Sequence, residues 1–206
     1  MTFHPMLLAH TADAHVIAAT VAVAFKDLDV ARWLVPDDDE RQAVLYRNFR
    51  IHVEHALEYG QVWTVPDHRG AAVWFARNGD LPAIDDYENR MTRACGPYAA
   101  NFRALDAAFD AAHPARPHHH LAFLAVDPYM QGRGLGSALL EQHLIHLDLT
   151  PRPVGSYLEA SSTRARELYL RYGYVDHGPP IRPADGVELW PMWRDPHPDR
   201  RFPPAV

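Results

Sequence analysis

The chain has 206 residues, 48% of them hydrophobic, which is enough for one globular domain with a substantial core. Its 20 Lys and Arg against 26 Asp and Glu give a formal net charge of −6, so nucleic acid is not expected as a partner. A sole cysteine, Cys95, excludes an intrachain disulfide and favours the cytoplasm. The longest apolar stretch, residues 16–25, is too short to span a membrane, and no signal-peptide pattern opens the chain.

The first part of the chain predicts a short strand, two long helices and a hairpin. Acidic residues 37–40 suit the first turn of the second helix, because a helix N-terminus attracts negative charge. Gly60 is placed to end that helix. The strand is expected at 5–8, the first helix at 12–25 with Thr11 as N-cap, the second between 39 and 60, and the hairpin strands at 61–65 and 71–76.

The second part alternates strands and helices. Residues 121–126 are a continuous apolar run, as expected for a central strand buried on both faces. Two helices, separated at Gly96-Pro97, are expected within 83–112. Further helices are expected from the glycine-rich turn to about residue 147 and at 163–172, and further strands at 156–160, 174–177 and 187–193. We expect one domain over residues 1–195 and a disordered tail at 196–206, which is rich in proline and charge.

Three glycines stand between the central strand and the helix that follows it. Gly132, Gly134 and Gly136 would let backbone N–H groups approach an anion closely, and the helix N-terminus adds about half a positive charge. The turn lacks the Gly-Lys-Ser/Thr ending of a P-loop and the spacing of a GxGxxG dinucleotide fingerprint. The segment therefore predicts either a pyrophosphate-binding turn of another kind or a tight connection.

Two linked motifs resemble one family. Gln131-x-x-Gly134-x-Gly136 after a strand is similar to motif A of the GCN5-related N-acetyltransferases (GNAT). The segments at 157–162 and 168–174 resemble the second half of that family, where a strand leads to a helix ending in a tyrosine and glycine pattern. The resemblance spans residues 4–193. Within the family, residues 159–161 and 190–193 resemble the branch of puromycin-type antibiotic acetyltransferases.

The resemblance implies an α/β (α+β) fold and acetyl-coenzyme A as cosubstrate. It implies a mixed, largely antiparallel twisted sheet with helices on both faces and a V-shaped splay between two parallel central strands, 121–126 and 156–160. Ala165 stands where relatives often carry asparagine. The implied coenzyme contacts are Leu124, Ala125 and Val126 for the pantetheine arm, and Gln131, Gly132, Arg133, Gly134, Leu135, Gly136 and Ser137 for the pyrophosphate. Because Ala165 departs from the family pattern, Arg164 and Arg166 are predicted to meet the 3′-phosphate.

Three residues are candidates for catalysis. Tyr169 matches the family tyrosine that protonates the departing thiolate. His120 and Glu159 are alternative bases for the attacking amine, since an ammonium has no lone pair. Metal binding by residues 118–120 is not expected, because consecutive strand residues point to alternate faces.

The sequence thus predicts an N-acetyltransferase that uses direct attack by a primary amine of a small molecule. A protein or peptide acceptor is one alternative, and a non-catalytic acyl-coenzyme A sensor is another. Because dimers are common in the family, a homodimer is also an expectation, although no segment identifies an interface.

Overall fold

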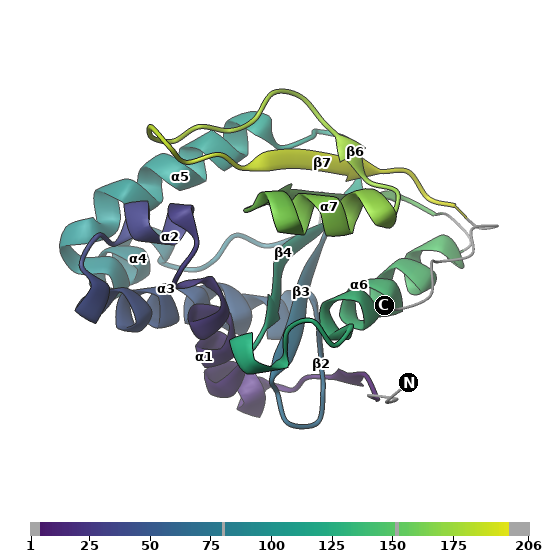
Figure 1. The fold of residues 1–206 in the computed structure, drawn as a ribbon, viewed down its shortest axis with the longest axis horizontal. Coiled ribbons are helices and arrows are strands. Elements are labelled where there is room, and N and C mark those ends of the chain that lie inside the picture. The colour runs from purple at the N-terminus through teal and green to yellow at the C-terminus, as the bar shows by residue number, and fades with distance from the viewer. Residues whose placement is uncertain (1–4, 80, 151–152, 198–206) are drawn as a thin grey trace.

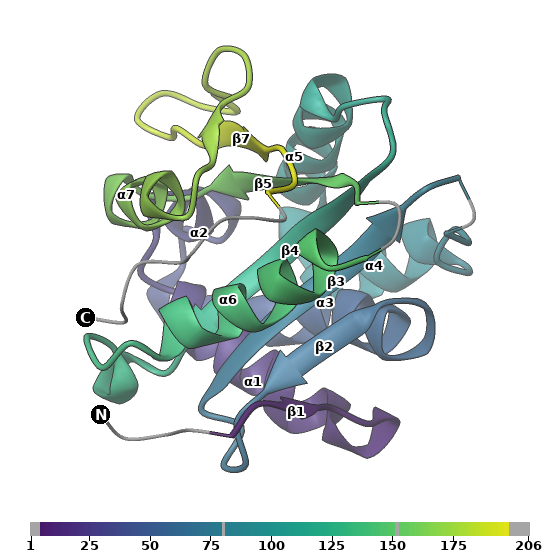
Figure 2. The ribbon, with the colours of Figure 1, turned by 90° about the vertical axis from the view of Figure 1, so that its right-hand side faces the viewer.

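A seven-stranded mixed sheet with helices on both faces forms the core of the computed structural model, which describes residues 5–79, 81–150 and 153–197 (Figures 1 and 2). The strand order is β1-β2-β3-β4-β5-β7-β6, so the predicted central strand is confirmed in the fourth position. The strands are β1 (Leu7–Leu8), β2 (Gln61–Thr64), β3 (Gly70–Arg77), β4 (His118–Val126), β5 (Gly155–Ala160), β6 (Val175–Asp176) and β7 (Trp190–Arg194).

The helices follow the predicted order, with one addition. They are α1 (Ala14–Phe25), α2 (Asp29–Leu34), α3 (Asp38–Tyr59), α4 (Tyr87–Cys95), α5 (Ala99–Ala112), α6 (Leu135–Asp148) and α7 (Thr163–Arg171), with 3₁₀ turns η1 (Thr11–Asp13), η2 (Gly96–Tyr98) and η3 (Pro128–Met130). Asp37 caps α3 by accepting the N–H groups of Asp39 and Glu40 at 2.9 and 3.1 Å. The acidic run is therefore a helix N-terminus, as predicted.

Some boundaries differ from the prediction. Thr11 does not cap α1; it opens η1, where the N–H of His10 bonds to Asp13 Oδ2 at 2.8 Å. The strand β4 begins at His118 rather than at 121, because its histidines pair with both β3 and β5. Six residues are too few to show helical periodicity, which is why α2 was missed. Of the predicted tail, residues 198–206 lie outside the described residues.

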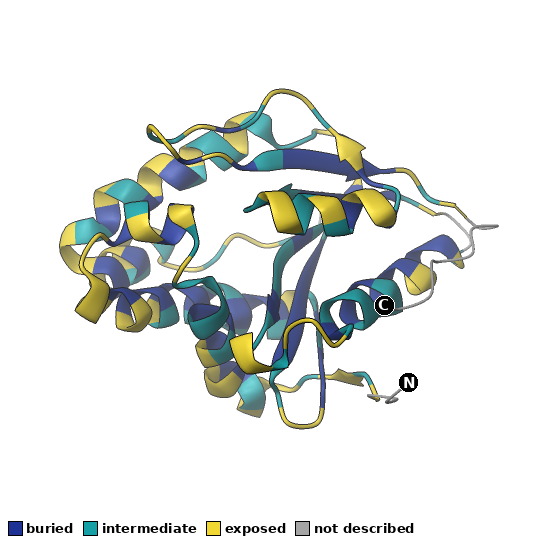
Figure 3. Cartoon of the chain, in the orientation of Figure 1, coloured by how far each residue is buried: buried dark blue, intermediate teal, exposed yellow. Residues whose placement is uncertain are grey.

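The sheet separates two hydrophobic clusters. Figure 3 shows the buried residues along the strands and along one side of several helices. The larger cluster lies between the sheet and α1 to α5, and includes Ile17, Leu45 and Phe102. The smaller cluster lies under α6 and α7, and includes Leu140, Leu158 and Tyr169. Strands buried on both faces read as continuous apolar runs, so this layering explains the pattern seen in β3 and β4.

The predicted splay is present between β4 and β5. These parallel strands pair only over His118 to His120 with Gly155 to Tyr157, and then separate. At the same point the pairing of β4 with β3 skips one residue, Ala122, between the pairs Trp74 with Leu121 and Val73 with Phe123. A bulge of this kind bends its strand. The bulge therefore turns the second half of β4 away from β5.

Among the described residues, every helix is either too short or too polar to cross a membrane.

Candidate active site

The turn between β4 and α6 is shaped by its glycines. Gly132 and Gly134 have φ angles of +73° and +80°, which residues with a side chain adopt rarely. Gly134 caps α6, and the first helical bond runs from Ala138 N–H to Gly134 C=O at 2.9 Å. The N–H groups of Leu135, Gly136 and Ser137 therefore precede the helical ladder and need other acceptors. This is the arrangement that suits an anion.

Gly136 differs from the other two glycines. Its φ lies outside the positive range, and a Cβ built there would meet only Val126 Cγ2 at 3.7 Å, an ordinary contact. Neither backbone strain nor packing within the chain requires glycine at this position. A close approach by a ligand is the remaining physical reason for it.

The strand edge ahead of the turn is open on one side. Leu124, Ala125 and Val126 pair with Ala72, Ala71 and Gly70 of β3, but the pairing with β5 has already ended. The side-chain amide of Gln131 donates to Val126 C=O at 3.1 Å, which draws the turn back onto the strand end. Asp127 accepts Tyr129 N–H at 2.8 Å and pairs with Arg69 at 3.3 Å, which fixes the start of the turn.

Three arginines are predicted from sequence to meet the coenzyme phosphates. Arg133 is exposed in the turn itself, and Arg164 is exposed in the first turn of α7. The third, Arg166, is ion-paired with Asp176. Ser162 caps α7 by accepting Ala165 N–H at 3.1 Å, so the departure at Ala165 leaves the helix start intact.

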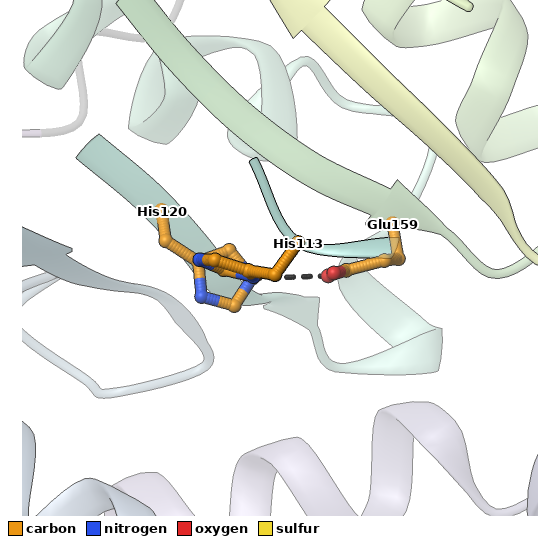
Figure 4. Close-up of side chains that lie close together, drawn as sticks. All are labelled: His113, His120 and Glu159. Carbon is orange, nitrogen blue, oxygen red and sulfur yellow. Dashed lines mark hydrogen bonds and ion pairs between the residues drawn. The ribbon is translucent and has the colours of Figure 1, made fainter. Parts of the chain in front are cut away.

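His120 and Glu159, proposed as alternative bases, lie side by side. His120 comes from β4 and Glu159 from β5, and His120 Nε2 stands 3.0 Å from Glu159 Oε2 (Figure 4). Their side chains are 13% and 6% exposed. Burial alone would raise the pKa of Glu159, but the facing His120, together with His113 and Tyr157, more than offsets it and holds the pKa below the ordinary value of a glutamate. Glu159 is therefore an ionised acceptor at neutral pH, and His120 Nε2 carries the proton of this bond.

The second ring nitrogen of His120, Nδ1, differs from Nε2 in its surroundings. With Nε2 protonated, a neutral His120 keeps its lone pair on Nδ1. Among the described residues, this buried Nδ1 has no hydrogen-bond partner. An imidazole held by a carboxylate on one nitrogen and bare on the other is the arrangement of a general base.

A third group, His113, was missed by the sequence reasoning. It follows the last residue of α5, and its ring centre lies 4.9 Å from that of His120. Burial lowers the pKa of His113 to about 3, so it is neutral at physiological pH. No local motif marks His113, because it reaches His120 only through the packing of α5 beside the sheet.

Tyr169 lies on the opposite face of the sheet. On β5, Leu158 and Ala160 face the α6 and α7 cluster that contains Tyr169, whereas Glu159 faces His120 on the other side. The Tyr169 ring centre lies 5.7 Å from that of Tyr174. Burial raises the pKa of Tyr169, so its phenol is protonated at neutral pH. The candidate acid and the candidate base thus lie on different faces of the sheet.

A separate pocket lies near the first residues of β4, on the α6 side. Its lining includes Pro117, His119, His146 and Val154. His119 reaches it from β4 and bonds to His143 of α6 with 3.0 Å between the rings' nitrogens. This end of the sheet is remote from the glycine turn, because β4 runs from His118 to Val126 toward that turn.

Comparison with known proteins agrees with this geometry. Residues 107–195 match the family model of the acetyltransferase (GNAT) domain. Mycothiol acetyltransferase of Propionibacterium freudenreichii subsp. shermanii is 26% identical over 168 residues, which are 77% of this chain and 50% of that protein. The chain therefore spans about half the length of this curated relative.

Solved structures share the architecture over the whole chain. The structure described as histone acetyltransferase HPA2 and related acetyltransferase from Corynebacterium glutamicum superposes with a TM-score of 0.71 at 28% identity, covering 100% of both chains. Arylalkylamine N-acetyltransferase 2 from Aedes aegypti gives a TM-score of 0.62 at 12% identity, with 95% of this chain and 100% of that one covered. Residues 107–195, which hold the β4 and β5 splay and the glycine turn, thus match the GNAT acetyltransferase domain, and the whole chain shares the fold of these acetyltransferases.

Proposed function

We propose that the protein transfers the acetyl group of acetyl-coenzyme A to a primary amine of a small molecule by direct attack. The observation that carries this proposal is the splay, because His120 and Glu159 lie beside it on one face of the sheet and the cluster that contains Tyr169 lies on the other face. A thioester entering from the α6 and α7 side would meet an amine from the α1 to α5 side. Attack would then need no covalent enzyme intermediate.

The coenzyme would be held by backbone groups along one path. Its pantetheine arm would pair with the open edge at Leu124, Ala125 and Val126, in the manner of an added strand. Its pyrophosphate would accept N–H groups from the turn between Gln131 and Ser137, with Arg133 adding charge. Arg164, exposed at the start of α7, is proposed for the 3′-phosphate.

Proton transfer would be divided between the two faces. His120 would accept a proton from the ammonium on Nδ1, while Glu159 holds Nε2–H and stabilises the imidazolium that forms. Since Nδ1 is closed to water in this structure, the amine must displace neighbouring side chains to reach it. Backbone N–H groups at the splay would stabilise the oxyanion, and the Tyr169 phenol would donate to the departing sulfur.

Gly136 offers a test of coenzyme binding that is separate from folding. Gly136→Ala adds only an ordinary contact with Val126 and replaces a helix-destabilising residue, so Tm should stay the same or rise. The new Cβ would nevertheless stand where a phosphate approaches, and we expect acetyl-coenzyme A to bind at least about tenfold more weakly. Isothermal titration calorimetry together with thermal unfolding checks both halves. Unchanged affinity would remove the turn from the coenzyme site.

The acceptor class is proposed from two sources: the relatives, and the resemblance of residues 159–161 and 190–193 to puromycin-type enzymes. The resemblance to that branch stays a prediction. The name mycothiol acetyltransferase describes a small-molecule acetyltransferase in that relative. A protein or peptide acceptor is the second candidate, because the Corynebacterium glutamicum structure is described as a histone acetyltransferase and related acetyltransferase. Cys95 is a free, buried thiol, which fits the proposed cytoplasmic location.

Thiol release from acetyl-coenzyme A tests the function and the acceptor together. Purified protein would be assayed against aminonucleosides, polyamines, amino acids and peptides. Turnover with a small amine supports the proposal, turnover confined to peptides supports the second candidate, and coenzyme binding without any turnover would indicate a sensor.

Tyr169→Phe tests the proposed acid in the same assay. Removing one hydroxyl should lower kcat by about 100-fold or more while leaving coenzyme affinity unchanged, because the group acts only as the sulfur departs. Tyr174→Phe is the matched control, since it removes the hydroxyl of a buried tyrosine in the same cluster that bonds to Ser156. The control should retain activity. Equal kcat in Tyr169→Phe and wild type would exclude the acid role.

A further inference from the structure

Three side chains from separate elements converge beside the splay: His113 after α5, His120 of β4 and Glu159 of β5 (Figure 4). We call them the trio. One ring nitrogen of each histidine and one carboxylate oxygen all lie within 4.8 Å of one another. All three residues are partly buried, which distinguishes the trio from a chance group of surface acids.

A hydrogen-bond chain fixes the tautomer of His113. His118 Nδ1 lies 2.8 Å from Arg116 C=O, which can only accept, so His118 donates from Nδ1. A neutral His118 that donates from Nδ1 has its lone pair on the other nitrogen, Nε2, which is therefore the acceptor. His113 Nε2 stands 3.1 Å from that acceptor and must donate to it. The lone pair of His113 is therefore on Nδ1.

This arrangement matches what a metal ligand needs. Ligating histidines are neutral, and the nitrogen that does not bind metal usually donates to a neighbouring acceptor, as His113 does to His118. Two imidazoles and one carboxylate, with a further position left for water, are a known ligand set of zinc. We propose that the trio binds a divalent transition-metal ion of the zinc class, which takes the place of the proton on His120 Nε2 while that proton moves to Nδ1 of the same ring.

The separations are compatible with one ion. Ligands at about 2.0–2.1 Å from a tetrahedral zinc lie about 3.4 Å apart, close to the 3.0 Å between His120 Nε2 and Glu159 Oε2. His113 has the most freedom to adjust, because it lies at the helix end rather than within a strand. Arg77, a cation near the trio, is close enough to Glu159 and Asp110 for both carboxylates to raise its pKa.

The site also explains why sequence reasoning did not predict a metal. Consecutive β4 residues do point to alternate faces: His119 contacts His143 of α6, while His118 and His120 share the face of His113. The converging ligands instead come from three elements that only the fold brings together.

The test is direct metal binding by the full chain, measured without coenzyme or amine. Protein freed of metal by chelator dialysis would be titrated with Co²⁺ followed by visible absorption, and with Zn²⁺ by calorimetry. We expect binding of one ion, with the intense bands of low-coordinate cobalt, and a loss of at least about tenfold in affinity in His113→Asn. The exposed His146 on α6 provides the control, and His146→Asn should bind as wild type does.

A second variant covers the case in which His113→Asn fails to fold. His118→Phe keeps a flat ring but removes the acceptor that fixes the His113 tautomer, and should weaken binding by about tenfold. Circular dichroism shows which variants are folded. The proposal is overturned if the wild type shows no cobalt bands and no heat of zinc binding. It is also overturned if a folded His113 or His118 variant binds metal with the same affinity as the wild type. Because no turnover is measured, failure of the acetyl-transfer proposal would leave this result unaffected.

Discussion

Replacing His120 by asparagine is expected to lower kcat/KM for the acceptor amine by about 100-fold or more. A positioned general base contributes about 10²–10⁴-fold, and asparagine can hydrogen-bond to Glu159 but cannot accept a proton. Coenzyme affinity should not change, because the turn lies at the other end of β4. Steady-state kinetics and calorimetry measure both quantities. The control His146→Asn alters an exposed histidine elsewhere and should leave the kinetics unchanged.

Glu159→Gln shows whether the two residues act as a unit. Without the negative charge, the imidazolium formed during catalysis loses its partner, so a reduced rate is expected. In the double variant, His120→Asn with Glu159→Gln, the loss should be close to that of His120→Asn alone, since residues of one catalytic unit are not additive. Additive losses would mean that the two side chains serve separate steps.

The pH dependence of kcat/KM distinguishes the two bases. A base acts only when unprotonated, so activity falls on the acid side of its pKa. Burial raises the pKa of Glu159, but His120, His113 and Tyr157 together more than offset this effect, so the net pKa lies below the ordinary value of a glutamate. A Glu159 base would therefore keep its activity at a pH below that ordinary value. An acid limb at higher pH would exclude Glu159 as the base, and an acid limb below that value would support Glu159 in place of His120.

Breaking the buried ion pair between Arg194 and Asp148 is expected to cost about 3–5 kcal/mol of unfolding free energy. Arg194 of β7 is 1% exposed, and its two terminal nitrogens lie 2.8 and 2.5 Å from the carboxylate oxygens of Asp148 at the end of α6. Its Nε also donates to Tyr172 C=O at 3.0 Å. The pair therefore joins β7, α6 and the end of α7.

Urea unfolding of Arg194→Met at neutral pH measures this cost, because the variant leaves a buried carboxylate without its partner. The double variant Arg194→Met with Asp148→Leu removes both charges and should recover much of the loss. Arg182→Met is the matched control, since the ion pair of Arg182 with Glu188 is 58% and 41% exposed and should contribute at most about 1 kcal/mol. A loss below about 1 kcal/mol in Arg194→Met would show that water or neighbouring groups compensate the carboxylate.

Local patterns in the sequence determined much of the fold. Apolar periodicity and turn residues placed the hairpin of β2 and β3, the break at Gly96-Pro97 and the long helix that ends at Gly60, because these features depend on neighbouring residues alone. The order of strand, glycine turn and helix likewise predicted the turn at 131–137. The puromycin-type leaning stays a prediction.

Tertiary structure decided how the chemistry is assembled. Sequence offered His120 and Glu159 as competing bases, 39 positions apart, and the parallel pairing of β4 with β5 made them partners. His113 and the Ala122 bulge carry no local signal, because one depends on where α5 packs and the other on register with β3. Residue patterns report what each segment prefers, whereas contacts between distant segments follow from how those segments bury their apolar faces together.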